Sequence, residues 1–389
     1  MDFNLSVEQK MIVKSAKEVA KKFGPEYWYE KEENHEFPID FFEALGELGF
    51  LGLEIPDEYG GTGMTLTEGT LALEALCSNG GGGAPVLNYL MGVLGGLSIA
   101  HHGNNTQKGT YLPKIADGKM ITAFGLTEPD AGTNSLAIET FAQKEGDYYI
   151  INGSKIFITV FEKAQAFLLV TRTSREESKR SKGMTLFLID LPNDAIKSSY
   201  IPKHGMNYSP TYDLGIDNLK VHKDCILGEE GKGWFHLLET INPERILVAA
   251  GAIGTARMAI KEAVKYAKKR VVFGRPIGAF QGVQFPLAGA YAKLECAWLA
   301  TIKAATLHDQ KQNPKKVGDI ANMAKYLAVE ASIEATYHAM QTLGGYGYAK
   351  EYHIERWWRE VQLFRLAPIT QQMTLNYTGE HILGLPKSY

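Results

Sequence analysis

Glu244 and Arg245 stand side by side ahead of a run of small and apolar residues that reaches Lys269. Asn242 suits an N-cap and Pro243 suits the first helical position, so we expect a helix to begin here. A glutamate can remove a proton from a weakly acidic carbon when burial raises its pKa, although a helix start would lower that pKa again. By position alone, an acid in a first turn more often only complements the helix dipole.

Short polar and glycine-rich segments at the ends of expected elements form a second group of candidates. They are Ala123–Thr133, Phe157–Thr159, Arg270–Gly274 and Gln341–Gly345. Backbone N–H groups and threonine hydroxyls in such turns can face a polar-edged ring or phosphates, and arginine suits a pyrophosphate. Each segment alone would usually be an ordinary turn or cap. Together they predict a dinucleotide site.

Several common kinds of site have no pattern in this sequence. There is no P-loop, no glycine fingerprint between a strand and a helix, and no serine nucleophile elbow. The ten histidines do not group in the sequence, and His101-His102 is an isolated pair, so we expect no metal site. Cys77, Cys225 and Cys296 are too far apart for a disulfide framework and fit a reducing compartment.

The composition is that of a soluble globular protein. The chain has 389 residues and a net charge of -3, with 41 basic and 44 acidic residues mixed along it. No basic stripe indicates a nucleic-acid binder, and no apolar run approaches the roughly 20 residues that span a bilayer. The Met-Asp-Phe start resembles neither a signal peptide nor a transit sequence, so we expect a cytoplasmic protein.

The order of periodic patterns predicts an α+β fold in three parts. Residues 1–120 form an all-α domain, residues 121–228 a small antiparallel β-barrel or sandwich, and residues 229–389 a four-helix bundle. The helices expected in the first domain are 7–23, 37–50, 66–76, 86–100 and 105–115, and those in the bundle are 244–270, 283–310, 316–343 and 369–383. In the middle domain, Asn152-Gly153 predicts a hairpin turn between two strands.

Five segments together resemble the acyl-CoA dehydrogenase family over nearly the whole chain. They are TEPDAGTN (127–134), NGSKIFIT (152–159), RVVFGRPIGAFQ (270–281), QTLGGYGY (341–348) and TQQ (370–372). The resemblance implies a fold of three domains, one FAD per subunit and a homotetramer, with some of these segments holding FAD across a subunit interface.

The resemblance also assigns site residues. The implied FAD contacts are Phe124, Leu126, Thr127, Thr133, Phe157, Thr159, Arg270, Phe273, Gln281, Gln341, Gly344, Gly345, Thr370 and Gln372, and the implied substrate contacts are Asn242, Arg245 and Thr133. Phe157 stands where the family usually has a tryptophan over the flavin, so an aromatic cover remains but the indole N–H is lost.

The catalytic base departs from the usual family position. Most members carry a glutamate near the C-terminus, where this chain has Pro368 in the segment LAPIT. A minority, including isovaleryl-type enzymes, carry the base at the start of the bundle helix, where this chain has Glu244. The resemblance therefore implies that Glu244 abstracts the α-proton of an acyl thioester while the β-hydride passes to flavin N5. Proline has no N–H, so the usual backbone donor to the substrate carbonyl is missing at Pro368.

Four functions remain open from the sequence. The first is dehydrogenation of an acyl-CoA with electron-transfer flavoprotein as acceptor. The second is oxidation of an aminoacyl group such as prolyl on a carrier protein, with oxygen as a further acceptor. The third is the same chemistry run as a reductase, and the fourth is a flavin-binding scaffold without catalysis.

Overall fold

The computed structural model describes residues 4–175 and 181–388 and divides into two compact units. One unit contains residues 1–32, 65–87 and 242–389, and the other contains residues 33–64 and 88–241. Helices α2 (Pro25–Asn34), α5 (Ala84–His102) and α7 (Gly233–Lys269) pass from one unit into the other. Each unit is therefore built from segments that are distant in the sequence.

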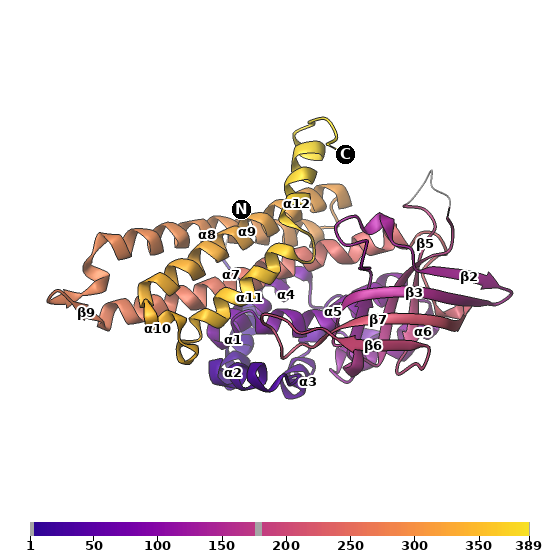
Figure 1. Cartoon of the computed structure of the whole chain (residues 1–389), viewed down its shortest axis with the longest axis horizontal. Coiled ribbons are helices and arrows are strands. Elements are labelled where there is room, and N and C mark those ends of the chain that lie inside the picture. Colours follow the sequence, from indigo (N-terminus) through magenta and orange to yellow (C-terminus); the bar gives the residue numbers. More distant parts are fainter. Residues whose placement is uncertain (1–3, 176–180, 389) are drawn as a thin grey trace. The chain divides into compact units, whose positions relative to one another are not determined.

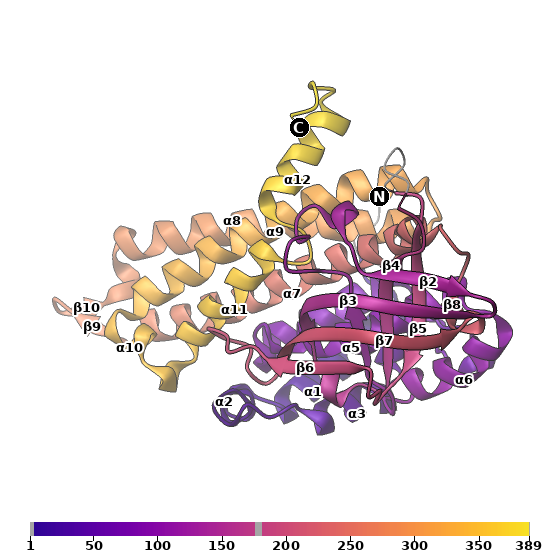
Figure 2. The same ribbon diagram turned by 45° about the vertical axis from the view of Figure 1, so that its right-hand side comes forward.

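The first unit is helical and contains the predicted four-helix bundle. Its elements are α1 (Val7–Lys22), α4 (Leu66–Leu76), most of α7, α8 (Gln281–Asp309), α9 (Pro314–Leu343), α10 (Gly345–Tyr348), α11 (Ile354–Leu366) and α12 (Gln371–Tyr377). Helices α7, α8 and α9 run alongside one another in both ribbon views, and α11 packs against α9 (Figures 1 and 2).

Small side chains bring the bundle helices close together. One buried cluster of the bundle is mostly alanine and joins α7, α8 and α9: Ala249, Ile253, Ala256, Ile260, Ala290, Leu294, Ala297, Ala328, Ala331 and Ala335. Alanine has the highest helix propensity and leaves little side-chain volume between two backbones. The pattern of small residues therefore specifies both the helices and their close spacing.

Two glycines of α7 mark its closest approach to neighbouring segments. A Cβ on Gly254 would lie 2.6 Å from the carbonyl oxygen of Glu74 on α4 and 2.7 Å from the Cβ of Cys77. A Cβ on Gly251 would lie 2.2 Å from a methyl carbon of Val86. These distances leave no room for a methyl group, so glycine is required for the contact rather than for a turn.

The second unit contains an eight-stranded sheet. Its strands are β1 (Thr122–Gly125), β2 (Phe141–Glu145), β3 (Tyr148–Thr159), β4 (Ala166–Arg172), β5 (Met184–Asp190), β6 (Ile196–Tyr200), β7 (Thr211–His222) and β8 (Ile226–Leu227). The order is β6-β7-β3-β2-β4-β5-β8, with β1 paired to β4. Most neighbours are antiparallel, but β4 pairs in parallel with β1 and with β2. Helices α3 (Ile39–Glu47) and α6 (Asn105–Ala116) complete the unit.

The prediction of a hairpin turn at Asn152-Gly153 is wrong. Strand β3 runs straight through both residues, with a register shift against β7 at this point. Gly153 has φ 151°, and a Cβ on it would lie 2.5 Å from the Thr140 hydroxyl, so its glycine permits a bulge and a close approach. The turn between β2 and β3 is Gly146-Asp147, where Gly146 has φ 64°. Glycine serves a bulge and a turn equally well, and the dipeptide alone does not distinguish them.

The expected helix start at Asn242 is also wrong. Helix α7 begins at Gly233 and continues through Pro243, which lies inside it. Proline removes one intrahelical hydrogen bond but does not by itself end a helix that is packed along its length. Glu244 therefore lies in the helix interior, and the helix dipole does not act on it as it would in a first turn.

Most other expected helices are present. Helices α1, α4, α5, α6, α8 and α9 lie where the patterns place them. The unexpected helices are α2, which buries only Trp28 and Glu32, and α11, whose charged residues form ion pairs with one another. In α11 these paired charged residues lie among the apolar ones, so the helical apolar stripe is difficult to recognise from the sequence alone.

Helix α5 corrects the expectation that no segment is long and apolar enough to cross a membrane. Within the described residues it is the one helix that passes this test of length and composition. It has 19 residues, and 89% of its most apolar window is buried inside the structure. A core helix of a folded protein passes the same test, so this is weak evidence for a membrane span.

The contact at Gly254 can be tested with one substitution at two places. We expect Gly254→Ala to lower the free energy of unfolding by about 1–3 kcal/mol, because the cost of overpacking exceeds the gain of about 1 kcal/mol in helix propensity. Gly289→Ala on α8 is the control, because a Cβ there meets nothing within 4 Å and should be stabilising. The measurement is denaturant unfolding of both variants. An equal change in unfolding free energy for Gly254→Ala and Gly289→Ala would contradict the packing argument.

Candidate active site

The motifs TEPDAGTN and NGSKIFIT meet in the second unit. The carbonyl oxygen of Thr127 accepts the backbone N–H of Ile156 at 2.9 Å, so the turn that follows β1 lies against the end of β3. Phe124 and Leu126 are half-buried beside this junction, and Thr159 lies at the end of β3. The structure thus brings together two segments that the sequence separates by about twenty residues.

Phe157 presents an aromatic face at this junction. Its side chain is 61% exposed, and its backbone has φ 60°. A positive φ is rare for a bulky residue and stores strain unless the surroundings impose it. Here a second register shift in β3, between Lys155 and Ile158, accompanies the unusual conformation. An exposed aromatic ring in a strained position fits a surface that covers a planar ligand.

A buried ion pair fastens the same two motifs. The Lys155 ammonium group donates to the Glu128 carboxylate at 2.7 Å and to the Leu126 carbonyl oxygen at 3.0 Å. The other oxygen of Glu128 accepts the N–H of Glu139 at 2.6 Å. Burial alone would raise the pKa of Glu128, but Lys155 and these hydrogen bonds outweigh it and lower the pKa. Glu128 and Lys155 therefore hold the turn in place, a role that was not predicted from the sequence.

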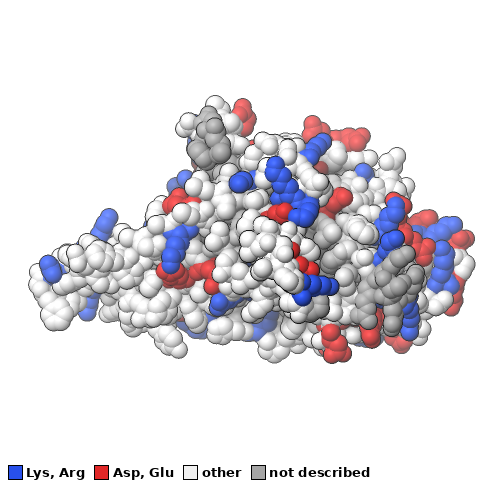
Figure 3. All heavy atoms as spheres, turned by 90° about the horizontal axis from the view of Figure 1, so that it is seen from above, with Lys and Arg blue, Asp and Glu red and all other residues white. Residues whose placement is uncertain are grey.

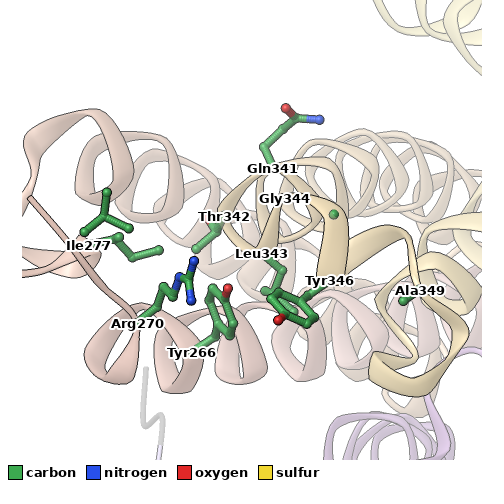
Figure 4. A pocket seen from close by; sticks show the side chains of 11 residues that line it. Tyr266, Arg270, Ile277, Gln341, Thr342, Leu343, Gly344, Tyr346 and Ala349 are labelled. Atoms are coloured by element: carbon green, nitrogen blue, oxygen red, sulfur yellow. The ribbon is translucent and has the colours of Figure 1, made fainter.

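In the first unit, an open cavity of about 550 Å³ lies between the end of α7 and the end of α9. Arg270, Gln341, Gly344 and Gly345, all predicted site residues, are among the residues that line it. Figure 4 shows the Arg270 side chain beside Tyr266, while the Gln341 side chain points away from it. A Cβ on either glycine would meet nothing within 4 Å, so a ligand can approach this backbone closely.

The two other predicted residues of this end of the bundle do not line the cavity. Phe273 is 91% exposed at the tip of a hairpin formed by β9 (Val271–Val272) and β10 (Arg275–Pro276). Phe273 and Gly274 both have positive φ, as a two-residue hairpin turn requires. Gln281 is exposed at the first position of α8.

The segment at Thr370 starts the last helix. The Thr370 hydroxyl accepts the N–H of Met373 at 3.3 Å and caps α12. Gln372 is exposed in the first turn of that helix. Thr133, in the turn of the second unit, is likewise exposed, so its side chain is accessible to a ligand.

Glu244 has the electrostatic properties of a base that works near neutral pH. Burial raises the pKa of its carboxyl group from 4.5 to about 7, and the neighbouring Arg245 guanidinium opposes that rise. Arg245 is itself oriented by Asn242, whose side-chain oxygen accepts from one guanidinium nitrogen at 3.0 Å. The three predicted residues Asn242, Glu244 and Arg245 therefore form one group on α7.

The side chain of Lys325, on α9, is buried near Arg245. No role was predicted for this lysine from the sequence. Its ammonium group donates to the carbonyl oxygen of Ile369 at 2.7 Å, directly after Pro368. Burial and the nearby Arg245 charge lower the pKa of Lys325 to about 8. The signal available in the sequence was a lone lysine among the small residues of ANMAKYLAVE. The fold thus uses Lys325 to hold the segment in which Pro368 replaces the family's usual glutamate.

The histidines are not as isolated as the sequence suggests. Among the described residues, His101, His102 and Glu239 each offer a metal-ligand atom, and these atoms lie within 4.8 Å of one another. The rings of His102 and His236 also stack, with centroids 4.2 Å apart. The expectation that the histidines do not group is therefore wrong, because residues far apart in the sequence meet in the fold.

Three family models match the chain in succession. They describe the N-terminal, middle and C-terminal domains of acyl-CoA dehydrogenase and match residues 6–119, 123–219 and 231–383. The chain belongs to the acyl-CoA dehydrogenase family. It is accordingly an FAD-dependent oxidoreductase, as the five motifs implied.

Individual members of the family align with this chain over almost its whole length. The acyl-CoA dehydrogenase fadE12 of Mycobacterium bovis is 40% identical over 386 residues, which are 99% of this chain and 98% of that protein. A glutaryl-coenzyme A dehydrogenase solved with glutaryl-CoA has a TM-score of 0.94 at 33% identity, covering 100% of this chain and 98% of that one. The prolyl acyl carrier protein oxidase AnaB has a TM-score of 0.92 at 26% identity, covering 98% and 100%.

The residues present fit FAD at the level of each unit. The exposed Phe157 ring and the turn at Thr127 offer an aromatic face and polar groups to a planar ring system. The Arg270 cavity offers a cation and open glycine backbone of the kind that suits phosphates. Both the Phe157 surface and the Arg270 cavity are present in this conformation of the chain.

The Glu128–Lys155 pair is expected to control the stability of the flavin-facing turn. Glu128→Gln leaves the Lys155 ammonium group buried without a counter-charge, so we expect a loss of about 3–5 kcal/mol in unfolding free energy. Asp147→Asn, which breaks an exposed ion pair with Lys223, is the control and should change little.

The sign of the pH dependence provides a second readout for this pair. Because the pKa of Glu128 is lowered in the folded state, its contribution is present above the ordinary value of 4.5 and is lost as the pH falls below it. Denaturant unfolding of wild type and Glu128→Gln should therefore converge at acid pH. A constant difference between the two down to low pH would contradict this assignment.

Proposed function

We propose that this protein α,β-dehydrogenates an acyl-CoA thioester and that Glu244 abstracts the α-proton. The observation that carries the proposal is the partly buried Glu244 carboxyl group, whose pKa desolvation raises to about 7. A thioester α-proton is only weakly acidic, so its base must be positioned close to it and must be basic near neutral pH. When bound, FAD supplies the acceptor for the β-hydride.

Two features of the sequence support Glu244 over another base. Pro368 occupies the position at which most family members carry their glutamate, and it has no group that accepts a proton. Arg245, which Asn242 orients, stands beside Glu244 and would contact the thioester or its pantetheine chain. Because Pro368 offers no N–H, another donor must stabilise the negative charge that develops on the carbonyl oxygen.

We assign the remaining predicted residues to FAD. Those of the second unit, Phe124, Leu126, Thr127, Thr133, Phe157 and Thr159, would hold the flavin portion, with Thr133 also contacting substrate. Those at the far end of the bundle, Arg270, Phe273, Gln281, Gln341, Gly344 and Gly345, would hold phosphates and adenosine, and Thr370 and Gln372 would also touch the flavin.

The length of α7 supports a cofactor site shared with a second subunit, as in the homotetramer that the resemblance implies. Arg270 follows the end of this helix, and at 1.5 Å per residue it is about 38 Å along the axis from Glu244, more than the diameter of a small domain. The Arg270 cavity is therefore too far from the base of its own chain to hold the cofactor used there. It is suited to the FAD of a second subunit, and the exposed Phe273 hairpin would lie at that interface.

Three further assignments complete the proposal. Its domains are residues 1–120, 121–228 and 229–389, a division that the three successive family-model matches support. The electron acceptor is an electron-transfer flavoprotein, and the protein acts in the cytoplasm.

A second candidate function is oxidation of an aminoacyl thioester on a carrier protein. The similarity to AnaB favours it, since that protein is a prolyl acyl carrier protein oxidase. Pro368 is also compatible with an altered position of the acyl group. Anaerobic flavin bleaching by a panel of acyl-CoA esters and prolyl-loaded carrier protein separates the two candidates. Bleaching by neither would favour the reductase direction or a scaffold without catalysis, and oxygen consumption would identify oxygen as the acceptor.

The role of Glu244 is tested most directly by Glu244→Gln. We expect this variant to retain FAD but to reduce its flavin more than about a hundredfold more slowly, a loss of roughly 3 kcal/mol of transition-state stabilisation. Glu262→Gln on the same helix is the control, because Glu262 forms a solvent-accessible pair with Lys265. Stopped-flow flavin reduction by the substrate found in the panel is the measurement. Near-normal reduction in Glu244→Gln would remove Glu244 from the mechanism.

The same reaction should depend on pH in a predictable direction. The carboxylate form of Glu244 is the base, so the rate should rise as the pH passes through about 7 and reach a plateau above it. At one unit below that pKa, the rate should be about tenfold lower than the plateau. A rate that is constant from pH 5.5 to 8.5 would contradict a titrating base with this pKa.

A further inference from the structure

Two histidines and one glutamate converge on the surface of the second unit. His101 and His102 end helix α5, and Glu239 lies on α7 within the same unit. The Nε2 atom of His102 lies 3.3 Å from one Glu239 oxygen, and the Nδ1 atom of His101 lies 4.0 Å from the same oxygen. Three ligand atoms from two helices therefore surround a single point.

These separations are close to those required by a tetrahedral zinc site. Ligands about 2.0–2.1 Å from an ion at tetrahedral angles lie roughly 3.3–3.4 Å from one another. The His102–Glu239 distance already has this value, the His101–Glu239 distance exceeds it by less than about 1 Å, and the ligand atoms of the two histidines lie within 4.8 Å of one another.

The His102 side chain is prepared for such a ligand. Its Nε2 atom is buried yet has no hydrogen-bond partner among the described residues. Its ring stacks on that of His236 with centroids 4.2 Å apart and planes 30° apart, which fixes its direction.

A fourth residue lies behind the first three. The Nε2 atom of His101 lies 3.1 Å from a carboxylate oxygen of Glu54, in the segment between α3 and α4. When Nε2–H donates to this carboxylate, the lone pair of Nδ1 points to the side of Glu239. A carboxylate that orients a ligating histidine in this way is a recurrent feature of zinc sites. Glu54 adopts φ 57°, so the fold maintains an uncommon backbone conformation at this residue.

We propose that His101, His102 and Glu239 bind one divalent zinc ion, with Glu54 orienting His101 and water completing the coordination. Two imidazole nitrogens and one carboxylate favour zinc over magnesium or calcium, which prefer sites built from oxygen atoms. His101 and Glu239 are 27% and 52% exposed at their side chains, so an ion can enter from solvent. The ion would join the end of α5 to α7 and would take no part in flavin chemistry.

Isothermal titration of the EDTA-treated, FAD-loaded protein with zinc chloride tests this site. We expect one zinc per chain, no displacement by excess magnesium, and a zinc-dependent rise in melting temperature. His102→Ala should weaken binding by more than about a hundredfold. His102→Gln, which keeps more of the ring's volume, should weaken it at least tenfold. Glu54→Gln leaves all three ligands in place and should weaken binding by about 10–100-fold.

His222→Ala is the matched control. His222 is also a partly exposed histidine of this unit next to a carboxylate, Asp224, but it has no second histidine beside it. This variant should bind zinc as wild type does. The flavin absorbance of each variant reports whether the protein has folded. Absence of saturable zinc binding by wild type would overturn the proposal, as would equal binding by wild type and by folded His102→Gln.

Discussion

The close approach of α7 to its neighbours is the constraint on which the functional geometry depends. Gly251 and Gly254 leave no space for a methyl group against Val86 and Glu74, so this stretch of α7 packs directly against its neighbours. The same helix carries Glu244 towards its beginning and delivers Arg270 at its end. One rigid element thus fixes the proposed base and the cationic cavity about 38 Å apart, which a flexible connection could not do.

Burial on this helix gives an ordinary carboxyl group its catalytic potential. Glu244 gains a pKa of about 7 because desolvation outweighs the attraction of Arg245. Lys325 adds a buried amino group nearby. Burial and the Arg245 charge lower its pKa to about 8, so it loses its proton more easily than an exposed lysine. Since Arg245 stabilises the carboxylate form of Glu244 while burial favours the protonated form, the site can hold a proton or release it near neutral pH.

The second unit uses charge differently. Glu128 and Lys155 are paired at 2.7 Å in a buried position, so each satisfies the other and neither is available for chemistry. Their effect is mechanical, because they hold the turn after β1 against β3 and so position the Thr127 turn beside Phe157. The cluster of His101, His102 and Glu239 is the opposite case, since the buried His102 Nε2 atom lies 3.3 Å from the Glu239 carboxylate but makes no hydrogen bond within the described part of the chain.

The sequence by itself determined the helices and strands with strong periodicity, the order of helical, β and helical parts, and the family through its motifs. It could do so because repeated apolar positions and short motifs are local properties that survive without knowledge of their neighbours. It failed at Asn152-Gly153 and at Pro243, where the same residues suit a turn or a bulge, a helix start or a helix interior. Only tertiary structure decided these cases, because packing along the whole element outweighs a local preference. Tertiary structure alone also joined Lys155 to Glu128, Lys325 to Ile369 and the histidines to Glu239, since burial and pairing depend on residues that lie far apart in the chain.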